Sequence, residues 1–283
     1  MYKTLISLRE LADNYTRPNW VLVDCHFQLD DPDVGREAYL RAHIPGAFYA
    51  HLDRDLSGPI IPGKTGRHPL PAISVLAETL SHWGIDKDTQ VVAYDNRGGA
   101  IAVRLWWMLK WLGHHAVAVL DGGFNDWQQA GHPVDEELPQ PNQKIFSPQP
   151  QPEMIATVDE IETIKEHPDK LLIDSRAPER YRGEVEPLDS IAGHIPGAVN
   201  HFFKHNLGPD EKMITVTELK ENFSSLIGDT QPNNVIFYCG SGVTSAHNVL
   251  AMAHAGLGFA RIYPGSWSEW ITDPNHEICI VDE

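Results

Sequence analysis

One cysteine stands where the local sequence favours a reactive thiolate. Cys239 directly follows the apolar, β-prone run 235–238 (Val-Ile-Phe-Tyr), and glycine-rich residues separate it from a helix-like stretch over about 244–255. This pattern predicts a cysteine at a strand end, above the N-terminus of a helix. There the uncapped amides and the positive end of the helix dipole stabilise an anion and lower the pKa of a thiol. The chemistry indicated is nucleophilic attack by the Cys239 sulfur, without an obvious partner base.

The other cysteines and the histidines carry weaker signals. Cys25 and Cys279 lie in apolar, strand-like contexts and are interpreted as small buried hydrophobic residues. Three distant cysteines without a CxxC motif indicate a reducing compartment and no disulfide framework, most simply the cytoplasm. The histidine pairs 114–115 and 247/254 lack acidic or cysteine neighbours at ligand spacing, so we expect no metal site.

Composition narrows the class of protein. The chain has 283 residues, 42% of them hydrophobic, which suffices for one large or two ordinary domains. Its formal net charge of −17 argues against a general nucleic-acid or anionic-membrane binder, because both need a basic surface. The first residues are not followed by a sustained apolar run, and no stretch approaches the roughly 18 apolar residues of a membrane span, so we expect neither a signal peptide nor a membrane segment.

The chain repeats itself. Val-Leu-Val-Asp at 21–24 and His-Ile-Pro-Gly-Ala at 43–47 return as Leu-Leu-Ile-Asp at 171–174 and His-Ile-Pro-Gly-Ala at 194–198. Further on, 91–95 matches 235–239, and 121–127 matches 264–270. Several matches in one order indicate a duplicated domain.

The predicted domains span 1–138 and 153–283, joined by a semi-rigid, proline-rich linker at 139–152. In each copy, short apolar strands alternate with amphipathic helices, and 100–112 is expected to be a well-buried helix. Such alternation predicts an α/β fold with a mainly parallel sheet, whose sites lie at the carboxyl ends of the strands.

Together, these features resemble the two-domain rhodanese-like sulfurtransferases. The resemblance covers nearly the whole chain and rests on the strand-end aspartates Asp24 and Asp174, the two His-Ile-Pro-Gly-Ala turns, the cysteine loop and the Gly-to-Trp segment near the end of each copy. It implies two tandem rhodanese-like domains, each a mainly parallel sheet flanked by helices. It also implies a catalytically silent first domain, in which Asp95 replaces the cysteine and the loop is one residue longer.

Within the family, the loop sequence sorts the substrates. Members that prefer thiosulfate carry basic residues after the cysteine, whereas members that prefer 3-mercaptopyruvate carry Cys-Gly-Ser-Gly-Val-Thr, the sequence found here at 239–244. Without cationic loop side chains a dianionic donor lacks its counter-charge, whereas a monoanionic keto-thiol needs only a hydroxyl, from Ser241, and an arginine. Arg180 matches the family's carboxylate-binding arginine, and guanidinium binds carboxylate bidentately.

The resemblance implies further site residues. His68 matches a first-domain histidine that faces the active site in the mercaptopyruvate group, and Asp55 is a possible acidic partner that would complete a trio with Ser241. Many such enzymes have a second arginine where this chain has Leu188; Arg182 or Arg176 would have to compensate. From the residues alone, Arg180 also fits a surface salt bridge and His68 an exposed turn. His43 and His194 are interpreted as structural.

The mechanism implied is double displacement. The Cys239 thiolate takes a sulfur atom from a small anionic donor, and the backbone amides of Gly240, Ser241, Gly242, Val243 and Thr244 stabilise the resulting persulfide. A thiophilic acceptor (cyanide, a thiol or a thioredoxin-like protein) then removes the outer sulfur. No metal or organic cofactor is required.

Three other functions compete with this interpretation. Thiosulfate:cyanide sulfurtransferase is the nearest alternative, since it differs only in the donor. A cysteine phosphatase needs a longer loop closed by an arginine, but no arginine follows Cys239 until Arg261, so this class is rejected. A non-catalytic rhodanese-like binding module is disfavoured by the intact cysteine loop.

Overall fold

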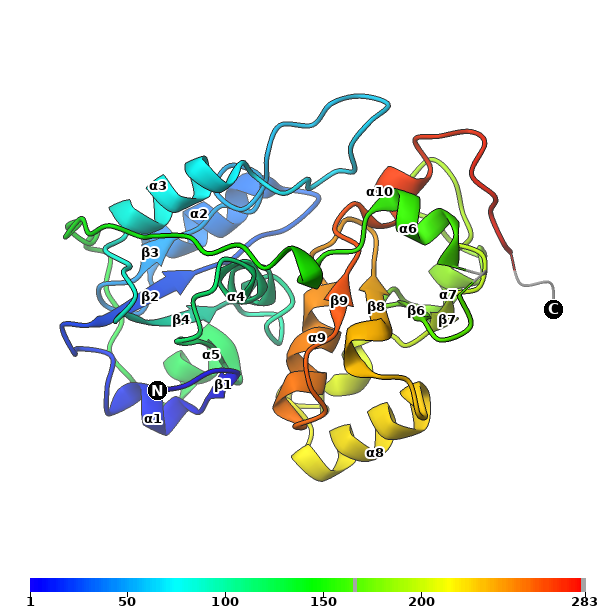
Figure 1. Cartoon of the computed structure of the whole chain (residues 1–283). Helices are drawn as coiled ribbons and strands as arrows, with labels where there is room; N and C mark the ends of the chain where they lie inside the picture. The colour runs from blue at the N-terminus through cyan, green and yellow to red at the C-terminus, as the bar shows by residue number, and fades with distance from the viewer. Residues whose placement is uncertain (165–166, 281–283) are drawn as a thin grey trace. The chain divides into compact units, whose positions relative to one another are not determined.

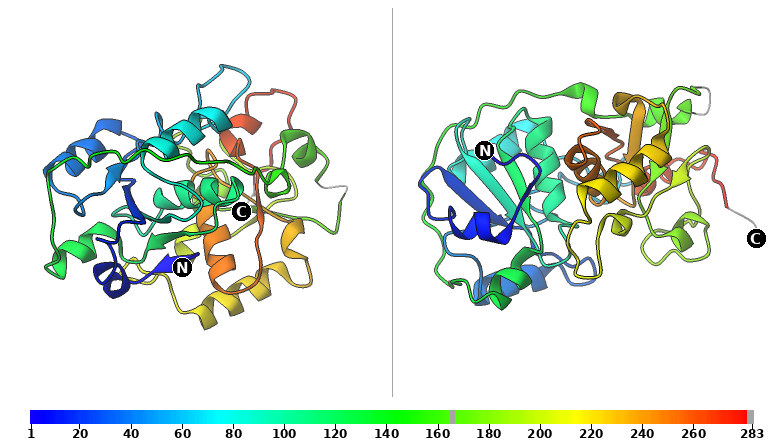
Figure 2. Two further views of the ribbon diagram at one scale, coloured as in Figure 1. Left: turned by 60° about the vertical axis from the view of Figure 1, so that its left-hand side comes forward. Right: turned by 90° about the horizontal axis from the view of Figure 1, so that it is seen from below.

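The structure is a computed structural model that describes residues 1–164 and 167–280, and it forms two compact units (Figure 1). The first unit comprises Met1–Gly58, Leu70–Gln151 and Pro209–Met213. The second comprises Pro59–Pro69, Pro152–Gly208 and the chain from Ile214 on. Each unit contains a sheet flanked by helices, as the two further views in Figure 2 also show.

The sheet of the first unit is parallel throughout its described pairings. Its strands are short apolar runs, and the central one is buried at every position, as expected for a strand covered on both faces. In spatial order they are β1 (Leu5–Ile6), β5 (Val117–Leu120), β4 (Gln90–Tyr94), β2 (Trp20–Asp24) and β3 (Phe48–Tyr49).

The sheet of the second unit is also parallel throughout its described pairings. Its spatial order is β7 (Val199–Asn200), β6 (Leu171–Asp174), β8 (Val235–Tyr238) and β9 (Arg261–Ile262). β8 is buried at all its positions and is equivalent to β4 of the first unit, because each pairs with the aspartate-ending strand of its own copy. The predicted α/β class with two parallel sheets is confirmed.

Helices follow the strands in both units. Those of the first unit are α1 (Leu8–Ala12), α2 (Pro32–Arg41), α3 (Ile73–His82), α4 (Ala102–Trp111) and α5 (Gly123–Gln129). Those of the second are α6 (Val158–Glu162), α7 (Pro178–Tyr181), α8 (Val216–Ile227), α9 (Ser245–His254) and α10 (Ser266–Trp270), with short 3₁₀ turns η1 (Pro152–Met154), η3 (Phe203–Asn206) and η4 (Pro232–Asn234).

Two helices show how the sequence sets their burial. α8 starts with a capping box between Thr215 and Glu218 and buries one stripe, formed by Leu219, Phe223 and Ile227 at four-residue spacing. α4 lacks such a stripe because it is apolar on most sides, and every one of its residues is buried. The prediction of a well-buried helix within 100–112 is confirmed.

The duplication extends to individual hydrogen bonds. In the first unit the His43 ring stacks on Tyr39 at 4.0 Å, its Nδ1 lies 2.7 Å from the Tyr39 carbonyl oxygen, and the Tyr39 hydroxyl donates to the Ala47 carbonyl. In the second unit His194 stacks on Tyr181 at 3.9 Å and makes the same backbone contact at 2.8 Å. Both histidines are buried and join their His-Ile-Pro-Gly-Ala turn to a tyrosine of the preceding helix, as the structural interpretation predicts.

One segment leaves its own copy. Pro59–Pro69, called the arm below, belongs to the first copy by sequence but to the second compact unit in the structure. Its backbone is held there, since the Arg67 amide donates to Ser268 Oγ at 3.0 Å. The predicted domain ranges are contiguous and do not include this excursion, and their exact limits stay predictions. Across residues 1–164 and 167–280, no helix combines the length and apolar character needed to cross a bilayer.

Candidate active site

The cysteine loop, residues 239–244, runs from the carboxyl end of β8 to the start of α9 (Figure 1). Its turn depends on Gly242, whose φ is +77° and whose added Cβ would lie 2.1 Å from the Pro264 carbonyl oxygen. A side chain at this position would therefore meet both backbone strain and a collision. Glycine is needed here to bring the loop against the strand-to-helix turn before α10.

The beginning of α10 fixes the loop backbone. The Trp267 amide donates to the Cys239 carbonyl at 3.0 Å, and the Ser268 amide donates to the Gly240 carbonyl at 2.9 Å. In return, the Cys239 amide donates to Ser266 Oγ at 3.1 Å. These bonds hold the cysteine in one conformation before any substrate arrives, which is the condition for a preorganised nucleophile.

The surroundings of Cys239 favour its thiolate. The residue is only 2% exposed, and burial raises the pKa of its thiol. Hydrogen bonds from the Thr244 hydroxyl and from the Ser241 and Ser245 amides lower the pKa by more, so the net shift is below the ordinary thiol value. Cys239 is thus a buried sulfur that is stabilised as an anion at a helix N-terminus.

Ser241 and His68 form a buried pair beside this sulfur. His68 Nδ1 lies 2.7 Å from Ser241 Oγ, and the two residues are 4% and 6% exposed, respectively. Because His68 comes from the arm and is buried there, it is not an exposed turn residue. A hydroxyl backed by an imidazole can polarise a carbonyl or pass a proton, so the pair has the chemistry expected for a keto-thiol donor.

Two guanidinium groups lie against the loop at Gly240. A Cβ added to this glycine would lie 3.0 Å from Arg67 Nη2 and 3.5 Å from both terminal nitrogens of Arg180. Arg180 therefore lies at the loop, and its role in binding substrate stays a prediction. Arg180 also forms ion pairs with Glu186 at 2.7 Å and with Asp189 at 3.2 Å. It therefore makes salt bridges, as the alternative interpretation predicts, while it lies at the loop.

These ion pairs continue in both directions as an alternating chain of acids and bases. Arg176 binds Asp174 at 2.6 Å and Glu186 at 3.2 Å, and at the other end Arg67 binds Asp189. In order, the chain is Asp174, Arg176, Glu186, Arg180, Asp189 and Arg67. The carboxylates of Glu186 and Asp189 are only 4% exposed, so they orient the arginines in a largely dry environment.

Two predicted residues do not take part in the contacts described above. Arg182 is half exposed and pairs with Glu184. Asp55 belongs to the first unit, where its carboxylate accepts a hydrogen bond from the His51 amide at 2.7 Å and where burial raises its pKa. Their roles in the site stay predictions. Leu188, where many family members have an arginine, is 44% exposed.

The groups around Cys239 suit an anion. Over the residues that the structure describes, no group of three or more histidine, cysteine, aspartate or glutamate side chains is placed to hold a metal ion. The donors around Cys239 are amides, hydroxyls and guanidinium groups, which bind anions.

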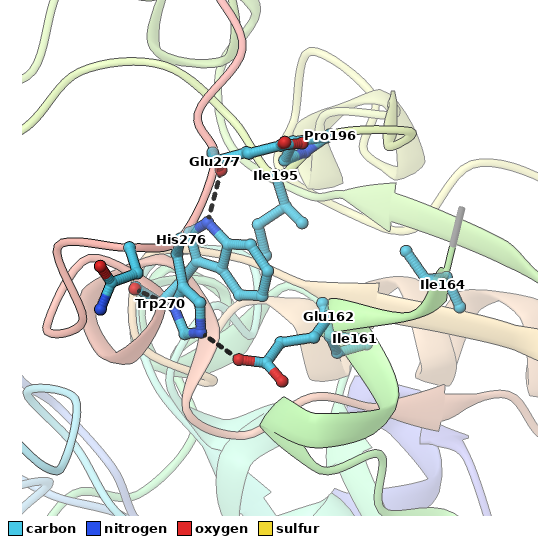
Figure 3. Close-up of a pocket in the computed structure, with 9 residues that line it drawn as sticks. Ile161, Glu162, Ile164, Ile195, Pro196, Trp270, His276 and Glu277 are labelled. Carbon is cyan, nitrogen blue, oxygen red and sulfur yellow. Dashed lines mark hydrogen bonds and ion pairs between the residues drawn. The ribbon is translucent and has the colours of Figure 1, made fainter. Parts of the chain in front are cut away.

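A hollow in the same unit, lined by none of the cysteine-loop residues, has a different character (Figure 3). It encloses about 240 Å³ above Ile161, Ile164, Ile195 and Trp270. Its polar groups are engaged with one another, since His276 Nε2 lies 2.7 Å from Glu162 and its Nδ1 lies 2.6 Å from the Trp270 carbonyl oxygen. Its lining residues include no thiol or hydroxyl nucleophile, so the cysteine loop is the stronger candidate for chemistry.

Comparison with known proteins matches the duplicated architecture. The profile of the rhodanese-like domain matches residues 7–130 and again residues 157–273. This chain belongs to the rhodanese-like family. It is 42% identical to a probable 3-mercaptopyruvate sulfurtransferase from Pseudomonas aeruginosa, over 98% of each chain. It is 36% identical to the putative thiosulfate sulfurtransferase SseB of Mycobacterium tuberculosis, over 98% of this chain and 96% of the relative.

A solved structure has the same fold over 95% of this chain. This rhodanese-like chain superimposes on SseA from Escherichia coli, described as a 3-mercaptopyruvate sulfotransferase of the rhodanese fold, with a TM-score of 0.79. The two share 29% identity over 95% of this chain and 100% of SseA. The predicted resemblance to two-domain rhodanese-like sulfurtransferases of the mercaptopyruvate type is thereby confirmed.

The first rhodanese-like copy also has a loop of anion-binding backbone amides, but an acidic side chain of its own accepts their hydrogen bonds. The Asp95 carboxylate occupies the position of the cysteine and accepts hydrogen bonds of 2.8–2.9 Å from loop and helix amides. The donors are the amides of Arg97, Gly99, Ile101 and Ala102. The same backbone geometry that stabilises a thiolate in the second copy thus stabilises a carboxylate in the first.

Sequence reasoning missed two residues of the site. Ser245, at the first position of α9, contributes to Cys239 a backbone amide that the predicted set of loop amides did not include. Arg67 lies at Gly240, although nothing in its local sequence marks it as part of the site. The one available signal was its position next to His68, which the family resemblance already placed at the active site.

Proposed function

We propose that this protein is a sulfurtransferase that moves a sulfur atom from 3-mercaptopyruvate to a thiophilic acceptor through a persulfide on Cys239. The observation that carries the proposal is the position of Cys239, which is buried at the end of β8 and held in a loop whose amides and hydroxyl lower the pKa of its thiol. The relatives named for this activity align with 98% and 95% of the chain.

In the first half-reaction, the Cys239 thiolate attacks the sulfur of the donor. The carbon–sulfur bond breaks, its electron pair passes to the carbon as the enolate of pyruvate, and the cysteine retains the sulfur as a persulfide, Cys–S–SH. Ser241, paired with His68, offers a hydroxyl that can stabilise the enolate oxygen and relay the proton that completes pyruvate. Arg180 holds the donor carboxylate.

In the second half-reaction, the acceptor attacks the outer sulfur of the deprotonated persulfide. With cyanide, thiocyanate leaves and the Cys239 thiolate returns, so electrons and atoms balance without a redox partner. The donors that stabilise the thiolate also stabilise it as the leaving group. For a cellular acceptor we propose a thiol or a thioredoxin-like protein, which is tested by replacing cyanide with reduced thioredoxin.

Thiosulfate is the second candidate donor. Arg67 and Arg180 bring two positive groups to the loop, although its own side chains carry none, and a dianion needs such a counter-charge. In that case sulfite is the leaving group and carries away the electron pair of the sulfur–sulfur bond. Relatives named thiosulfate sulfurtransferases also align over nearly the whole chain.

The test compares both donors on matched variants. We expect wild type to gain the mass of one sulfur atom on incubation with mercaptopyruvate, and Cys239→Ser to gain none and to lose turnover. Cys279→Ser, which alters a half-buried cysteine outside the loop, serves as the control and should behave as wild type. Steady-state kcat/KM with cyanide then ranks the donors. Full turnover by Cys239→Ser, or no persulfide on wild type after incubation with mercaptopyruvate, would overturn the proposal.

A further inference from the structure

Arg67 is the outermost member of the ion-pair chain beside the cysteine loop. Its side chain is 28% exposed, compared with 15% for Arg180 and 4% for Asp189. The chain thus runs from a buried acid at the end of β6 to a guanidinium group that solvent and small anions can reach. A group in this position is able to meet a substrate without breaking the buried pairs behind it.

The geometry directs two guanidinium groups at one spot. Arg67 Nη2 and both terminal nitrogens of Arg180 lie 3.0–3.5 Å from the place where a Cβ on Gly240 would stand. Burial and the neighbouring charge of Arg180 both lower the pKa of Arg67, whereas the Cys239 thiolate raises it. The repulsion between two positive charges held this close is reduced when an anion lies between them.

Asp189 already shows what these arginines bind. Its carboxylate bridges the two arginines: one oxygen accepts a hydrogen bond from Arg67 Nη1 and the other accepts one from Arg180 Nη2. A guanidinium group has five N–H donors, so this bond does not exhaust either side chain. Arg67 bonds Asp189 through Nη1, and it is Nη2 that lies over Gly240.

The arm fixes Arg67 in this position. Its own amide donates to Ser268 Oγ, and the next residue, His68, bonds Ser241. The preceding Gly66 packs so closely that a Cβ there would lie 2.6 Å from the Gly265 carbonyl oxygen. Anchored on both sides, the Arg67 side chain loses little further entropy when it binds a substrate.

We propose that Arg67, together with Arg180, binds the carboxylate of the sulfur donor, so that Arg67 is a specificity-determining residue of this site. It supplies from the arm the second guanidinium group that Leu188 does not provide. This inference rests on the proposed function, because it assigns a contact to the donor of that reaction.

The first experiment separates carboxylate binding from general damage. KM and kcat are measured for mercaptopyruvate and for mercaptoacetone, the same keto-thiol without a carboxylate, with cyanide as acceptor. For Arg67→Gln we expect KM for mercaptopyruvate to rise about 10- to 100-fold, the effect of one lost charge-assisted contact, with kcat within about twofold. The kinetics of mercaptoacetone should hardly change.

A matched control comes from the same arm. Lys64→Gln removes the same charge from an exposed arm residue and should leave both donors unaffected. Arg67→Lys keeps the charge but not the planar fork, so its KM for mercaptopyruvate should lie between those of wild type and Arg67→Gln. Equal losses with both donors, or an unchanged KM for mercaptopyruvate, would overturn the assignment.

Failure of the Arg67 assignment and failure of the proposed function give different results. If wild type forms the Cys239 persulfide from mercaptopyruvate and Arg67→Gln has an unchanged KM, the function stands and this inference fails. If wild type forms no persulfide from mercaptopyruvate, the proposed function itself fails.

Discussion

His68 Nδ1 lies 2.7 Å from Ser241 Oγ, although the two residues are 173 positions apart in the sequence. The contact exists because the arm, Pro59–Pro69, leaves the first copy of the repeat and joins the second compact unit. The first copy of the duplication, which has Asp95 where the second has Cys239, therefore supplies side chains to the cysteine loop.

The pair predicts a donor-dependent loss of activity. His68→Gln and Ser241→Ala should each lower kcat/KM for mercaptopyruvate by about 100-fold, because the pyruvate enolate needs its oxygen stabilised and a proton delivered. Thiosulfate should lose much less, since sulfite leaves with its electron pair and needs no proton. The double variant should lose little beyond either single one if the residues act as a unit. Additive losses, or equal losses with both donors, would contradict this; Ser225→Ala, on the exposed face of α8, is the control.

The pH dependence of thiol reactivity should depend on Thr244. Its hydroxyl is the largest of the contributions that lower the pKa of Cys239. Wild type should therefore alkylate with a midpoint below the ordinary thiol value of about 8.5, because the thiolate persists as the pH falls. In Thr244→Val the midpoint should move to higher pH, and the rate near neutral pH should drop. Thr244→Ser keeps the hydroxyl and should resemble wild type; a midpoint that is the same in all three proteins would refute the assignment.

Gly242 should be far less tolerant of a side chain than a comparable glycine. Gly256, just after α9, has nearly the same φ, +75° against +77°, but nothing lies within 4 Å of its added Cβ. Gly256→Ala should thus cost only the backbone strain, about 1 kcal/mol. Gly242→Ala should cost at least about 2 kcal/mol more, through the collision with Pro264, and should abolish transfer. Urea unfolding measures the difference, and similar values for the two variants would show that the collision is relieved by movement.

The sequence was sufficient to predict the features that come from the duplication or from residues close to one another along the chain. The duplicated strands, the turns with His43 and His194 and the strand–loop–helix around Cys239 are local patterns, so they predict the fold class and the candidate nucleophile. The buried α4 also followed from its composition.

The rest depends on contacts that no local pattern encodes. Arg67 lies in a turn-rich stretch whose composition indicates only a loop, and its position at Gly240 follows from the path of the arm through the second unit. Likewise, Arg180 matches a family position, but its link to Arg67 runs through the carboxylate of Asp189. Nothing in the local sequence marks Asp189 as the partner of both arginines. Charge chains of this kind are set by tertiary packing, not by spacing.

Asp95 should be a stability residue, although it stands at the equivalent of the nucleophile. Its carboxylate satisfies four backbone amides with two oxygens, whereas a carboxamide at this position would turn N–H donors towards some of them. Asp95→Asn should therefore lower the free energy of unfolding by about 2–4 kcal/mol and leave persulfide formation on Cys239 unchanged. Asp88→Asn, whose side chain is 75% exposed, is the control and should cost almost nothing. If the two variants are equally stable to urea, the four amide hydrogen bonds to Asp95 contribute nothing to the free energy of unfolding, and the prediction is wrong.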